Sequence, residues 1–278
     1  MDTCRGPVET GARIFRTLNV RNDRYPKKKA TDPQALVYGI RAVAEAITSG
    51  KEIDRLFIQQ GLKSELFSEL RKLINEREIQ FQYVPFEKID RLVGNRNHQG
   101  VAAFLSPVSF QHIEDILPSI FENGETPLIL VLDRVTDVRN FGAIARTAVC
   151  AGVHAIVVPS RGAAQVNADA VKTSAGALHS IPVCREDNLK ETIEYLKNSG
   201  LKIAACTEKT DTLIYNAELD GPLAIIMGSE EDGISGEYLK RADVLVKIPM
   251  SGSIASLNVS VAAGIILFEA VRKRMKNN

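Results

Sequence analysis

Short apolar segments alternate with longer amphipathic ones through the second half of the chain, and this alternation constrains the fold more than any other feature. Three of these segments, at 128–132, 155–159 and 223–227, are apolar at nearly every position. Strands of this kind occur where helices cover both faces of a parallel sheet, whereas half-exposed strands alternate apolar and polar residues. The pattern therefore predicts an α/β domain with a parallel sheet and helices on both faces.

The complete pattern of this domain gives five strands and five helices. The predicted strands are 128–132, 155–159, 201–207, 223–227 and 244–248, and the predicted helices are 140–151, 168–177, 189–198, 236–242 and 257–276. Ligands of open parallel sheets bind beyond the carboxyl ends of the strands. The loops that follow these strands are therefore where a functional site is expected.

A smaller α/β unit precedes this domain, at residues 36–105. Its predicted helices are 39–49, 63–77 and 86–92, and its predicted strands are 55–59, 80–84 and 100–105. Residues 106–126 contain Pro107, Pro118 and a turn-like stretch, which favours a linker between the two units. The amino-terminal residues 1–35 carry eight Lys and Arg against four Asp and Glu and few large apolar residues, so they are predicted to form a flexible basic tail.

The composition narrows the class of protein. The 278 residues have a formal net charge of +1, which argues mildly against a protein that coats RNA through phosphate contacts alone. The four cysteines are isolated from one another, and no His lies at a metal-ligand spacing from them, so neither disulfides nor a metal site is expected. No segment has the length and apolarity of a membrane span or a signal peptide. These features predict a cytoplasmic protein without a metal.

The loops lack the motifs of several common α/β enzymes. A dinucleotide-binding domain needs a glycine-rich turn after its first strand, and the stretch from Asp133 to Gly142 contains one glycine. The chain also contains no G-x-x-x-x-G-K-[ST] phosphate loop, no G-x-S-x-G nucleophile elbow and no H-E-x-x-H metal helix. Each of these enzyme classes is therefore disfavoured.

Three other segments, each following a predicted strand, carry the polar residues instead. They are Asn140-Phe-Gly-Ala-Ile-Ala-Arg146, Met227-Gly-Ser-Glu-Glu-Asp-Gly-Ile-Ser235 and Ile248-Pro-Met-Ser-Gly-Ser-Ile-Ala-Ser-Leu-Asn-Val-Ser260. In the first, Asn140 is expected at the start of a helix, with Arg146 on the same side nearly two turns later; an N-cap and a surface arginine would give the same pattern. The acids of the second could equally be a solvated loop.

The third segment has more polar groups than a helix start needs. Ser256 is the predicted N-cap of the last helix, and Asn258 and Ser260 add polar groups in its first turn, although one cap is sufficient. A loop of this composition leaves backbone N–H and C=O groups free. Such groups can bind the edge of an adenine without charged side chains.

In this order, the three segments resemble the three motifs of the SPOUT superfamily, in particular its TrmH/SpoU branch of RNA 2′-O-ribose methyltransferases. The resemblance covers residues 127–276, and the Ser-Leu-Asn-Val-Ser run is its most specific part. Residues 36–105 are similar to the small substrate-binding domain of the bacterial 23S ribosomal RNA guanosine 2′-O-methyltransferases in this branch. The resemblance implies that residues 127–278 form a methyltransferase domain with a C-terminal trefoil knot, that the protein is a homodimer, and that S-adenosylmethionine donates a methyl group to RNA.

The resemblance also assigns site residues. Those implied for the reaction are Asn140, Arg146, Glu230, Ser256 and Asn258, and those implied near the methyl donor are Thr207, Gly228, Ile248 and Leu257. Arg146 matches an arginine that approaches the reacting ribose, commonly across the dimer interface. Because a guanidinium stays protonated at neutral pH, we favour phosphate binding and oxyanion stabilisation over proton abstraction for Arg146.

In the smaller unit, RNA contacts are expected at Tyr38, Arg41, Arg96 and His98, since arginines bind phosphates and aromatic rings stack on unpaired bases. The stretch that contains Arg96 and His98 could also be a simple turn. Three alternatives remain open: an enzyme that methylates transfer RNA, a ribosomal RNA methyltransferase that confers antibiotic resistance, and a non-catalytic RNA-binding or ribosome-assembly factor. The substrate-binding unit favours ribosomal RNA over transfer RNA, and the presence of all five reaction residues disfavours the non-catalytic factor.

Overall fold

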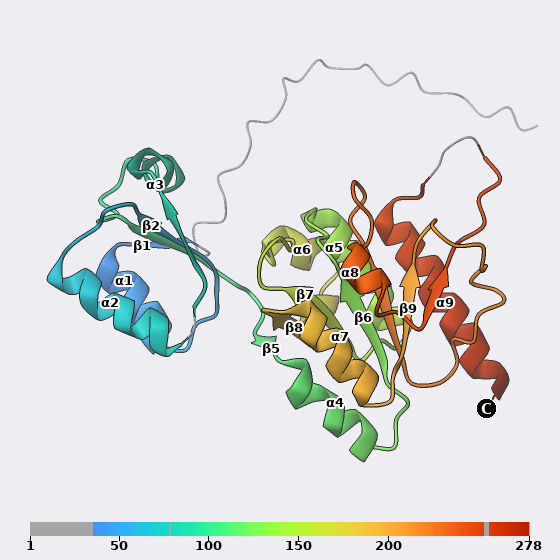
Figure 1. The fold of residues 1–278 in the computed structure, drawn as a ribbon. Coiled ribbons are helices and arrows are strands. Elements are labelled where there is room, and N and C mark those ends of the chain that lie inside the picture. Colours follow the sequence, from blue (N-terminus) through green and yellow to red (C-terminus); the bar gives the residue numbers. More distant parts are fainter. Residues whose placement is uncertain (1–35, 78, 253–255, 278) are drawn as a thin grey trace, which may run out of the picture. The chain divides into compact units, whose positions relative to one another are not determined.

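Two separate sheets, one of four strands and one of seven, organise the chain (Figure 1). The computed structural model describes residues 36–77, 79–252 and 256–277, so the predicted tail at 1–35 lies outside the described residues. Within the described part, no helix is both long enough and apolar enough to cross a membrane.

The four-stranded sheet belongs to the smaller N-terminal unit. Its elements are β1 (Leu36–Tyr38), α1 (Ile40–Thr48), β2 (Ile53–Gln59), α2 (Glu65–Glu76), β3 (Phe81–Val84), α3 (Phe86–Val93) and β4 (Val101–Leu105). The strand order is β1-β4-β2-β3, with β4 antiparallel to both of its neighbours. The predicted helices and strands of this unit are confirmed to within a few residues. Strand β1 was not predicted because its three residues are too few to show a period.

Helices cover both faces of this small sheet. Leu56 and Ile58 of β2 pack with buried residues of α1 and α2, whereas Phe57, which lies between them in sequence, packs with α3. Successive side chains of a strand point to opposite faces, so this alternation fixes which helix covers which face.

The seven-stranded sheet forms the core of the larger C-terminal unit. Its elements are β5 (Phe110–Gln111), α4 (Ile113–Glu122), β6 (Leu128–Leu132), α5 (Val138–Cys150), β7 (Ala155–Pro159), α6 (Ala168–Thr173), the 3₁₀ helix η1 (Ala177–His179), β8 (Val183–Glu186), α7 (Leu189–Asn198), β9 (Lys202–Cys206), β10 (Leu223–Met227), α8 (Gly236–Leu239), β11 (Val244–Val246) and α9 (Val259–Asn277). The strand order is β11-β9-β10-β6-β7-β8-β5, and every pair of neighbours is parallel. The predicted parallel sheet is confirmed, while the trefoil knot stays a prediction.

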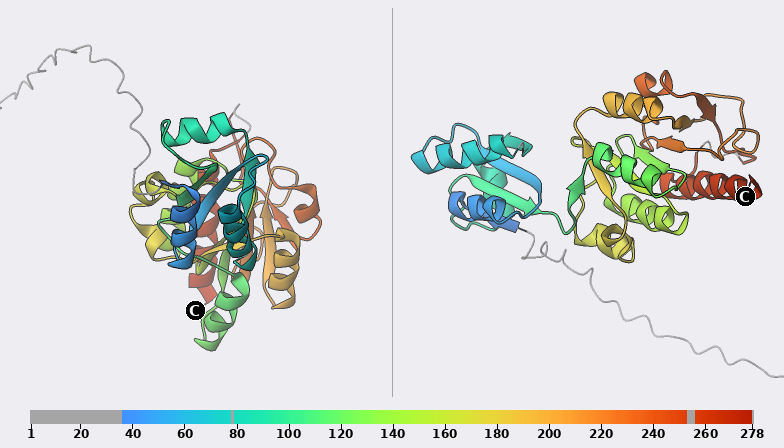
Figure 2. Two further views of the ribbon diagram at one scale, coloured as in Figure 1. Left: turned by 90° about the vertical axis from the view of Figure 1, so that its left-hand side faces the viewer. Right: turned by 90° about the horizontal axis from the view of Figure 1, so that it is seen from below.

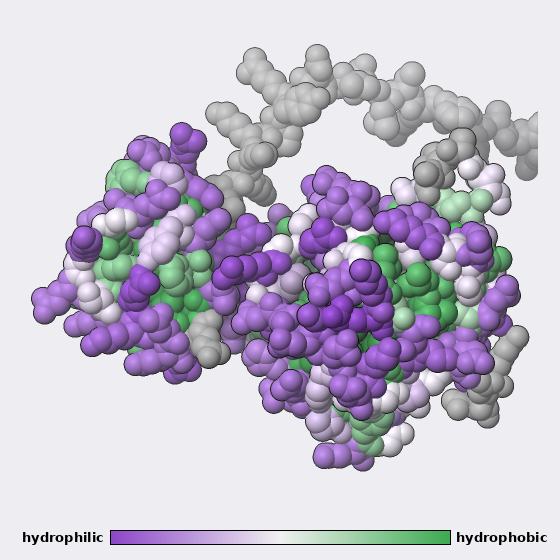
Figure 3. All heavy atoms as spheres, in the orientation of Figure 1, coloured by the Kyte–Doolittle hydropathy of each residue, from purple (hydrophilic) through white to green (hydrophobic). Residues whose placement is uncertain are grey.

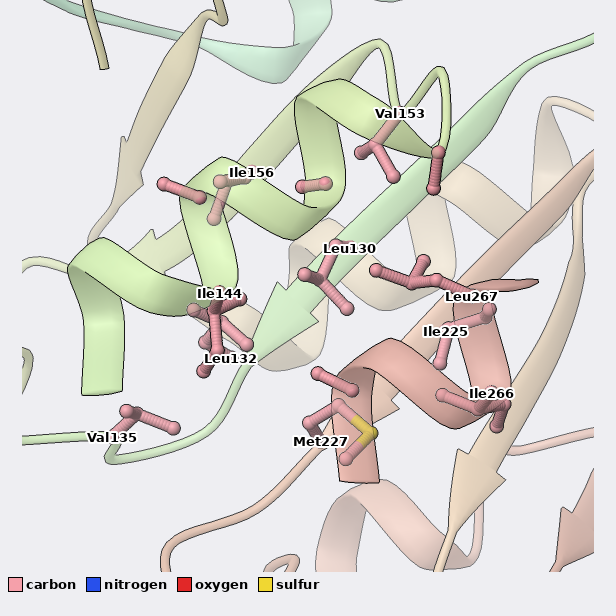
Figure 4. Close-up of a cluster of buried hydrophobic side chains, with 14 of the residues drawn as sticks. Leu130, Leu132, Val135, Ile144, Val153, Ile156, Ile225, Met227, Ile266 and Leu267 are labelled. Carbon is pink, nitrogen blue, oxygen red and sulfur yellow. The ribbon is translucent and has the colours of Figure 1, made fainter. Parts of the chain in front are cut away.

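Helices lie on both faces of this sheet, as the view from below shows (Figure 2). On one face Leu130 packs in a cluster with Ile144 of α5 and Ile266 of α9 (Figure 4). On the other face Ile129 packs in a cluster with Ile193 of α7. Each fully buried side chain of this size stabilises the fold by about 1.5–3 kcal/mol. Hydrophilic residues dominate the face of the molecule drawn in Figure 3, with smaller hydrophobic patches among them.

The predicted linker at 106–126 is wrong for most of its length. Strand β5 pairs with β8, and α4 packs on the sheet through Ile113, Leu117 and Ile120. These three side chains recur at helical spacing, but Pro118 inside the helix and the turn-like residues after it obscured that signal. Strand β8 was also missed, because only its first two residues are buried and its last two are charged.

Candidate active site

The polar segments meet at the carboxyl edge of the seven-stranded sheet. From β6 the chain passes outward to β7 and β8, then crosses to the other side of β6 to form β9, β10 and β11. Ligands of an open α/β sheet usually bind at the point where the strand order reverses in this way. The backbone N–H of Asp133, just after β6, donates to the carbonyl of Met227, at the end of β10, over 2.8 Å. The loops that follow these two strands therefore begin side by side.

One polar side chain from each of the three segments joins a single hydrogen-bonded cluster. Nδ2 of Asn258 donates to Oε1 of Glu230 over 2.7 Å and to Oδ1 of Asn140 over 3.0 Å. The backbone N–H of Val259 also donates to Oε1 of Glu230, over 3.2 Å. The structure thus brings together three of the five residues that the resemblance implied for the reaction.

Asn258, and not Ser256, caps helix α9. The helix begins at Val259, and Oδ1 of Asn258 accepts a hydrogen bond from the N–H of Ser260 at 3.0 Å. The first N–H groups of a helix lack partners and carry a partial positive charge, so the Asn258 oxygen and the Glu230 carboxylate both stabilise this end. The predicted cap was two residues early because serine and asparagine are equally good N-caps.

Helix α5 also begins earlier than predicted, at Val138 rather than at Asn140. Asp137 is its N-cap, and Oδ1 of Asp137 accepts from the N–H of Asn140 over 2.8 Å. Because Asp137 supplies the cap, the side chain of Asn140 is available to accept from Asn258. An N-cap role therefore does not explain Asn140.

The loop after β10 is folded tightly on itself. A Cβ added to Gly228 would lie 2.1 Å from the backbone carbon of Gly233, so only glycine fits there. Gly233 has a φ of +68°, and Ser229 and Gly233 exchange two backbone hydrogen bonds of 3.0 and 3.2 Å. This turn fixes the position of Glu230, which lies within it.

A buried carboxylate that the sequence analysis missed ties the same loop to the end of β6. Asp133 is 2% exposed, and it accepts from the N–H of Ser235 over 2.7 Å and from Arg134 over 3.0 and 3.3 Å. Arg134 also donates to Asp232 over 3.1 Å and to the carbonyl of Gly233. The hydrogen bond to Asp133 raises the pKa of Arg134, so the arginine stays charged. Two charged residues directly after a fully buried strand were the available signal.

A cavity of about 460 Å³ adjoins the cluster at the carboxyl ends of β9, β10 and β11. The predicted donor-site residues Gly228, Ile248 and Leu257 line it, and so do Glu230 and Ser256. Its volume lies within the range of about 300–1,000 Å³ that small-molecule sites occupy. The cavity therefore joins four predicted residues to the cluster through Glu230.

Thr207 does not belong to the lining that the structure describes. Its side chain is 7% exposed, and Oγ1 accepts from the N–H of Lys209. The neighbouring Cys206, Glu208 and Lys209 line the cavity instead, which sequence spacing alone could not resolve. Burial raises the pKa of Cys206 to about 11, so its thiol stays neutral and is a poor nucleophile at pH 7.

Arg146 lies apart from the cluster. At about 100° per helical residue, six residues turn its side chain about 240° from that of Asn140, so the prediction that both face the same side of α5 is wrong. Arg146 is exposed, and it makes no hydrogen bond or ion pair with any residue that the structure describes. Arg146 is therefore not part of the hydrogen-bonded cluster in one copy of the chain.

Of the predicted RNA-binding residues, Tyr38 and Arg96 lie close to each other, whereas His98 is not part of this pair. Nη1 of Arg96 is 3.4 Å from the hydroxyl of Tyr38, and Arg41 is exposed on α1. His98 is 2% exposed, and its Nδ1 accepts from the N–H of Gly100, so the predicted stacking role of His98 is wrong.

Phe86 is the exposed ring at this place. It is 48% exposed, and its centroid lies 4.7 Å from that of the buried His98. An aromatic residue at the first position of an amphipathic helix was the available signal. In the ranges 36–77, 79–252 and 256–277, no three His, Cys, Asp or Glu side chains gather as a metal site would require.

Comparison with known proteins assigns both units. The model of the SpoU rRNA methylase family matches residues 127–268, and the model for RNA 2′-O ribose methyltransferase substrate binding matches residues 36–111. The chain is 37% identical over 240 residues to the 23S rRNA (guanosine-2′-O-)-methyltransferase RlmB of Escherichia coli K12, which covers 86% of this chain and 98% of that protein.

Solved structures show the same fold. The SpoU methyltransferase AviRb of Streptomyces viridochromogenes, in complex with AdoMet, matches with a TM-score of 0.55 and 26% identity over 87% of this chain and 90% of that one. An AdoMet-bound rRNA methyltransferase of Sinorhizobium meliloti matches with a TM-score of 0.55 and 25% identity, covering 86% of this chain and 87% of that one. The order of the motifs, the matched domains and the identity to RlmB agree, and the chain belongs to the SpoU rRNA methylase family.

Proposed function

We propose that this protein transfers a methyl group from S-adenosylmethionine to a ribose 2′-hydroxyl of RNA, and that its substrate is a guanosine of 23S ribosomal RNA. The observation that carries the proposal is the Asn140–Glu230–Asn258 cluster, whose Glu230 lines the 460 Å³ cavity. Similarity to RlmB, whose name states this substrate, supports the choice of nucleotide and RNA. Because both substrates are found in the cytoplasm, we place the enzyme there.

The lining of the 460 Å³ cavity fits S-adenosylmethionine. The side chains that line it carry both charges, negative on Glu208, Glu230 and Glu231 and positive on Lys209 and Lys247, which suits a ligand with a positive sulfonium and a negative carboxylate. Backbone groups at Ile248 and Leu257 can bind the adenine edge, as the resemblance implies. When bound, this cofactor supplies the electrophilic methyl group.

The protein residues have to orient the acceptor and stabilise its oxygen. The hydroxyl oxygen becomes partly negative as it attacks, and a nearby cation or hydrogen-bond donor lowers the barrier. Asn258 and Glu230 hold each other in place, so either can contact a ligand without prior rearrangement. Arg146 is the cation that the family pattern supplies for this oxygen and the adjoining phosphate.

A second copy of the chain would provide that arginine. Val261, Phe268 and Met275 recur every seven residues along α9 and are 50%, 49% and 75% exposed. Val149, which is 38% exposed, lies three residues after Arg146 on α5, the helix that packs against α9. An exposed apolar surface of this kind marks an interface between proteins. A homodimer through α5 and α9 would therefore bury it next to Arg146.

The N-terminal unit would bind the RNA around the target. Arg96 and Tyr38 lie together, and Phe86 offers an exposed ring on which an unpaired base can stack. Arg41 adds an exposed positive charge on α1. Such contacts suit a folded ribosomal RNA with unpaired loops.

The direct test is a methylation assay with the purified protein. Tritium from the labelled methyl group should enter unmodified 23S ribosomal RNA, and calorimetry should show binding of S-adenosylmethionine. Absence of S-adenosylmethionine binding would refute the proposed methyltransferase activity. Ribose-methylation sequencing of a deletion strain identifies the nucleotide, and loss of a transfer RNA mark with an unchanged ribosomal map would refute the proposed substrate.

A further inference from the structure

An arginine and two aromatic rings meet on the N-terminal unit, away from the residues assigned so far. Phe81 and Tyr83 belong to β3, which is an edge strand of the four-stranded sheet, and Arg71 belongs to α2. The two rings meet edge to face, with their centroids 5.3 Å apart. The guanidinium of Arg71 lies 5.7 Å from the centroid of Phe81 and donates to the hydroxyl of Tyr83. These three side chains form the β3 patch.

The β3 patch presents one ring to solvent and holds it in place. Phe81 and Tyr83 share one face of the sheet, because alternate residues of a strand point the same way. Phe81 packs against the core that α1 and α2 cover, whereas Tyr83 is 44% exposed. Single exposed apolar side chains are common on protein surfaces. Here, however, the contacts with Arg71 and Phe81 order the ring in advance, which lowers the entropy that a ligand stacked on it would lose.

The charge of Arg71 is available to a ligand. Arg71 has no carboxylate partner among the residues that the structure describes. The residues three before and four after it on α2 are Ser68 and Asn75, both exposed and uncharged, and side chains at these spacings share one side of a helix. An arginine of this kind binds phosphate, and an amide can hydrogen-bond to the edge of a base. The β3 patch therefore combines the groups that bind unpaired RNA.

The β3 patch is separate from the Tyr38–Arg96 pair. Strands β1 and β3 lie at opposite edges of the sheet, and the register places Tyr38 level with Gln82, the neighbour of Tyr83. With two strands between them, the two tyrosines lie about 14 Å apart across the sheet. Tyr38 packs with the cluster that α3 covers, whereas Phe81 packs on the other face. One nucleotide therefore cannot contact both places.

We propose that the β3 patch binds a second unpaired segment of the substrate RNA, with a base stacked on Tyr83 and a phosphate bound by Arg71. This inference rests on the proposed function and names a second point of contact with its substrate. The patch lies within residues 36–111, which match the substrate-binding family model, and the Asn140–Glu230–Asn258 cluster lies outside that range. The patch should therefore contribute to RNA affinity and not to methyl transfer itself.

The test separates RNA affinity from catalysis. Tyr83→Ala should raise the dissociation constant for unmodified 23S ribosomal RNA, measured without cofactor, and the KM for this RNA, each about tenfold, because one stacked base contributes affinity of this order. The kcat and the affinity for S-adenosylmethionine should not change. Tyr83→Trp should bind RNA as the wild type does, since it keeps a ring. Arg71→Ala should lower the slope of log affinity against log salt concentration by about one, because one phosphate contact is lost.

Phe121→Ala is the matched control. Phe121 is 41% exposed on α4, outside the N-terminal unit, so its loss should leave RNA affinity unchanged. Wild-type RNA affinity in Tyr83→Ala, or an equal loss in Tyr83→Trp, would overturn the proposal. Unchanged RNA affinity with lost binding of a ribosomal protein would also overturn it and assign the patch to a protein partner. Failure of the wild-type protein to methylate RNA would instead refute the proposed function, since the RNA titration needs no methyl transfer.

Discussion

Nδ2 of Asn258 lies 2.7 Å from Oε1 of Glu230, and this hydrogen bond joins the start of the last helix to the loop after β10. The two residues are 28 positions apart in the chain and belong to different predicted segments. Their contact gives the third segment a role that its sequence alone did not show. The surplus polar group in the first turn of α9 holds a carboxylate at the cavity.

Glu230→Gln should weaken cofactor binding with little effect on stability. The variant keeps an oxygen acceptor but loses the charge that faces a cationic ligand and the N–H groups of α9, and hydrogen bonds to charged groups are about twice as strong as neutral ones. We expect the dissociation constant for S-adenosylmethionine to rise about tenfold, which corresponds to about 1.4 kcal/mol. Calorimetry measures this. Glu218→Gln, which removes a surface carboxylate paired with Lys202, should leave binding unchanged.

Asp133→Asn should destabilise the fold and loosen the loop that carries Glu230. The buried carboxylate accepts from Ser235 and from Arg134, and a neutral amide cannot serve both donors equally well. Since Arg134 is partly exposed, water can replace some of the lost interaction, and we expect a loss of about 2 kcal/mol in the free energy of unfolding. Urea denaturation tests this. An unchanged midpoint would show that the ion pair does not hold the loop.

Two inactive variants should restore activity when they share a dimer. If Arg146 serves the site of the partner subunit, a mixed dimer of Arg146→Ala and Glu230→Ala chains contains one site with both native residues. Random mixing gives about half mixed dimers, so about a quarter of the wild-type activity should return. Co-expression with two affinity tags isolates the mixed dimer for assay. No recovery in that dimer would place Arg146 in the site of its own chain.

The stability lost in Asp243→Asn should depend on pH. Burial alone would raise the pKa of Asp243, but hydrogen bonds from Lys197, at 2.6 Å, and from the N–H of Ile203, at 2.9 Å, outweigh burial and hold this pKa below its ordinary value. A lowered pKa in the folded state stabilises the fold above the unfolded-state value of about 3.9, and the benefit disappears as pH falls through the folded-state pKa.

Wild type should therefore be more stable than Asp243→Asn at pH 7, and the difference should shrink as pH falls below the unfolded-state value of about 3.9. Denaturation by urea across this pH range measures the difference. A gap that stays constant down to pH 2 would mean that the charge of Asp243 contributes nothing. Asp187→Asn, which alters an exposed carboxylate in the same domain, provides the comparison.

The sequence predicted the parallel sheet well because its central strands are buried on both faces. Leu128–Leu132 and Leu223–Met227 are apolar at every position, and their bounds in the structure match the prediction. Segments at the margins of the sheet were harder to predict from the sequence. Strand β5 has only two residues, and α4 contains Pro118, so local composition resembled a loop although tertiary packing makes both elements regular.

The residues of the candidate site could be predicted from the sequence, but the contacts between them could not. Glu230 and Asn258 could be named from the motif pattern, whereas the choice of Asn258 over Ser256 as the cap depends on where Glu230 places its carboxylate. The side of α5 on which Arg146 lies follows from helix geometry alone. Burial of His98 beneath Phe86 depends on the packing of the loop that precedes β4, which no local pattern shows.

The position of β10 between β6 and β9 has a consequence for the biosynthesis of this protein. The ribosome makes β6, β7 and β8 first, but the place beside β6 is filled only when residues 223–227 have emerged. The hydrogen-bonded cluster is complete only when Asn258, which lies 20 residues from the C-terminus, has also been synthesised. A nascent chain that stops before this point lacks the start of α9, which forms one wall of the 460 Å³ cavity.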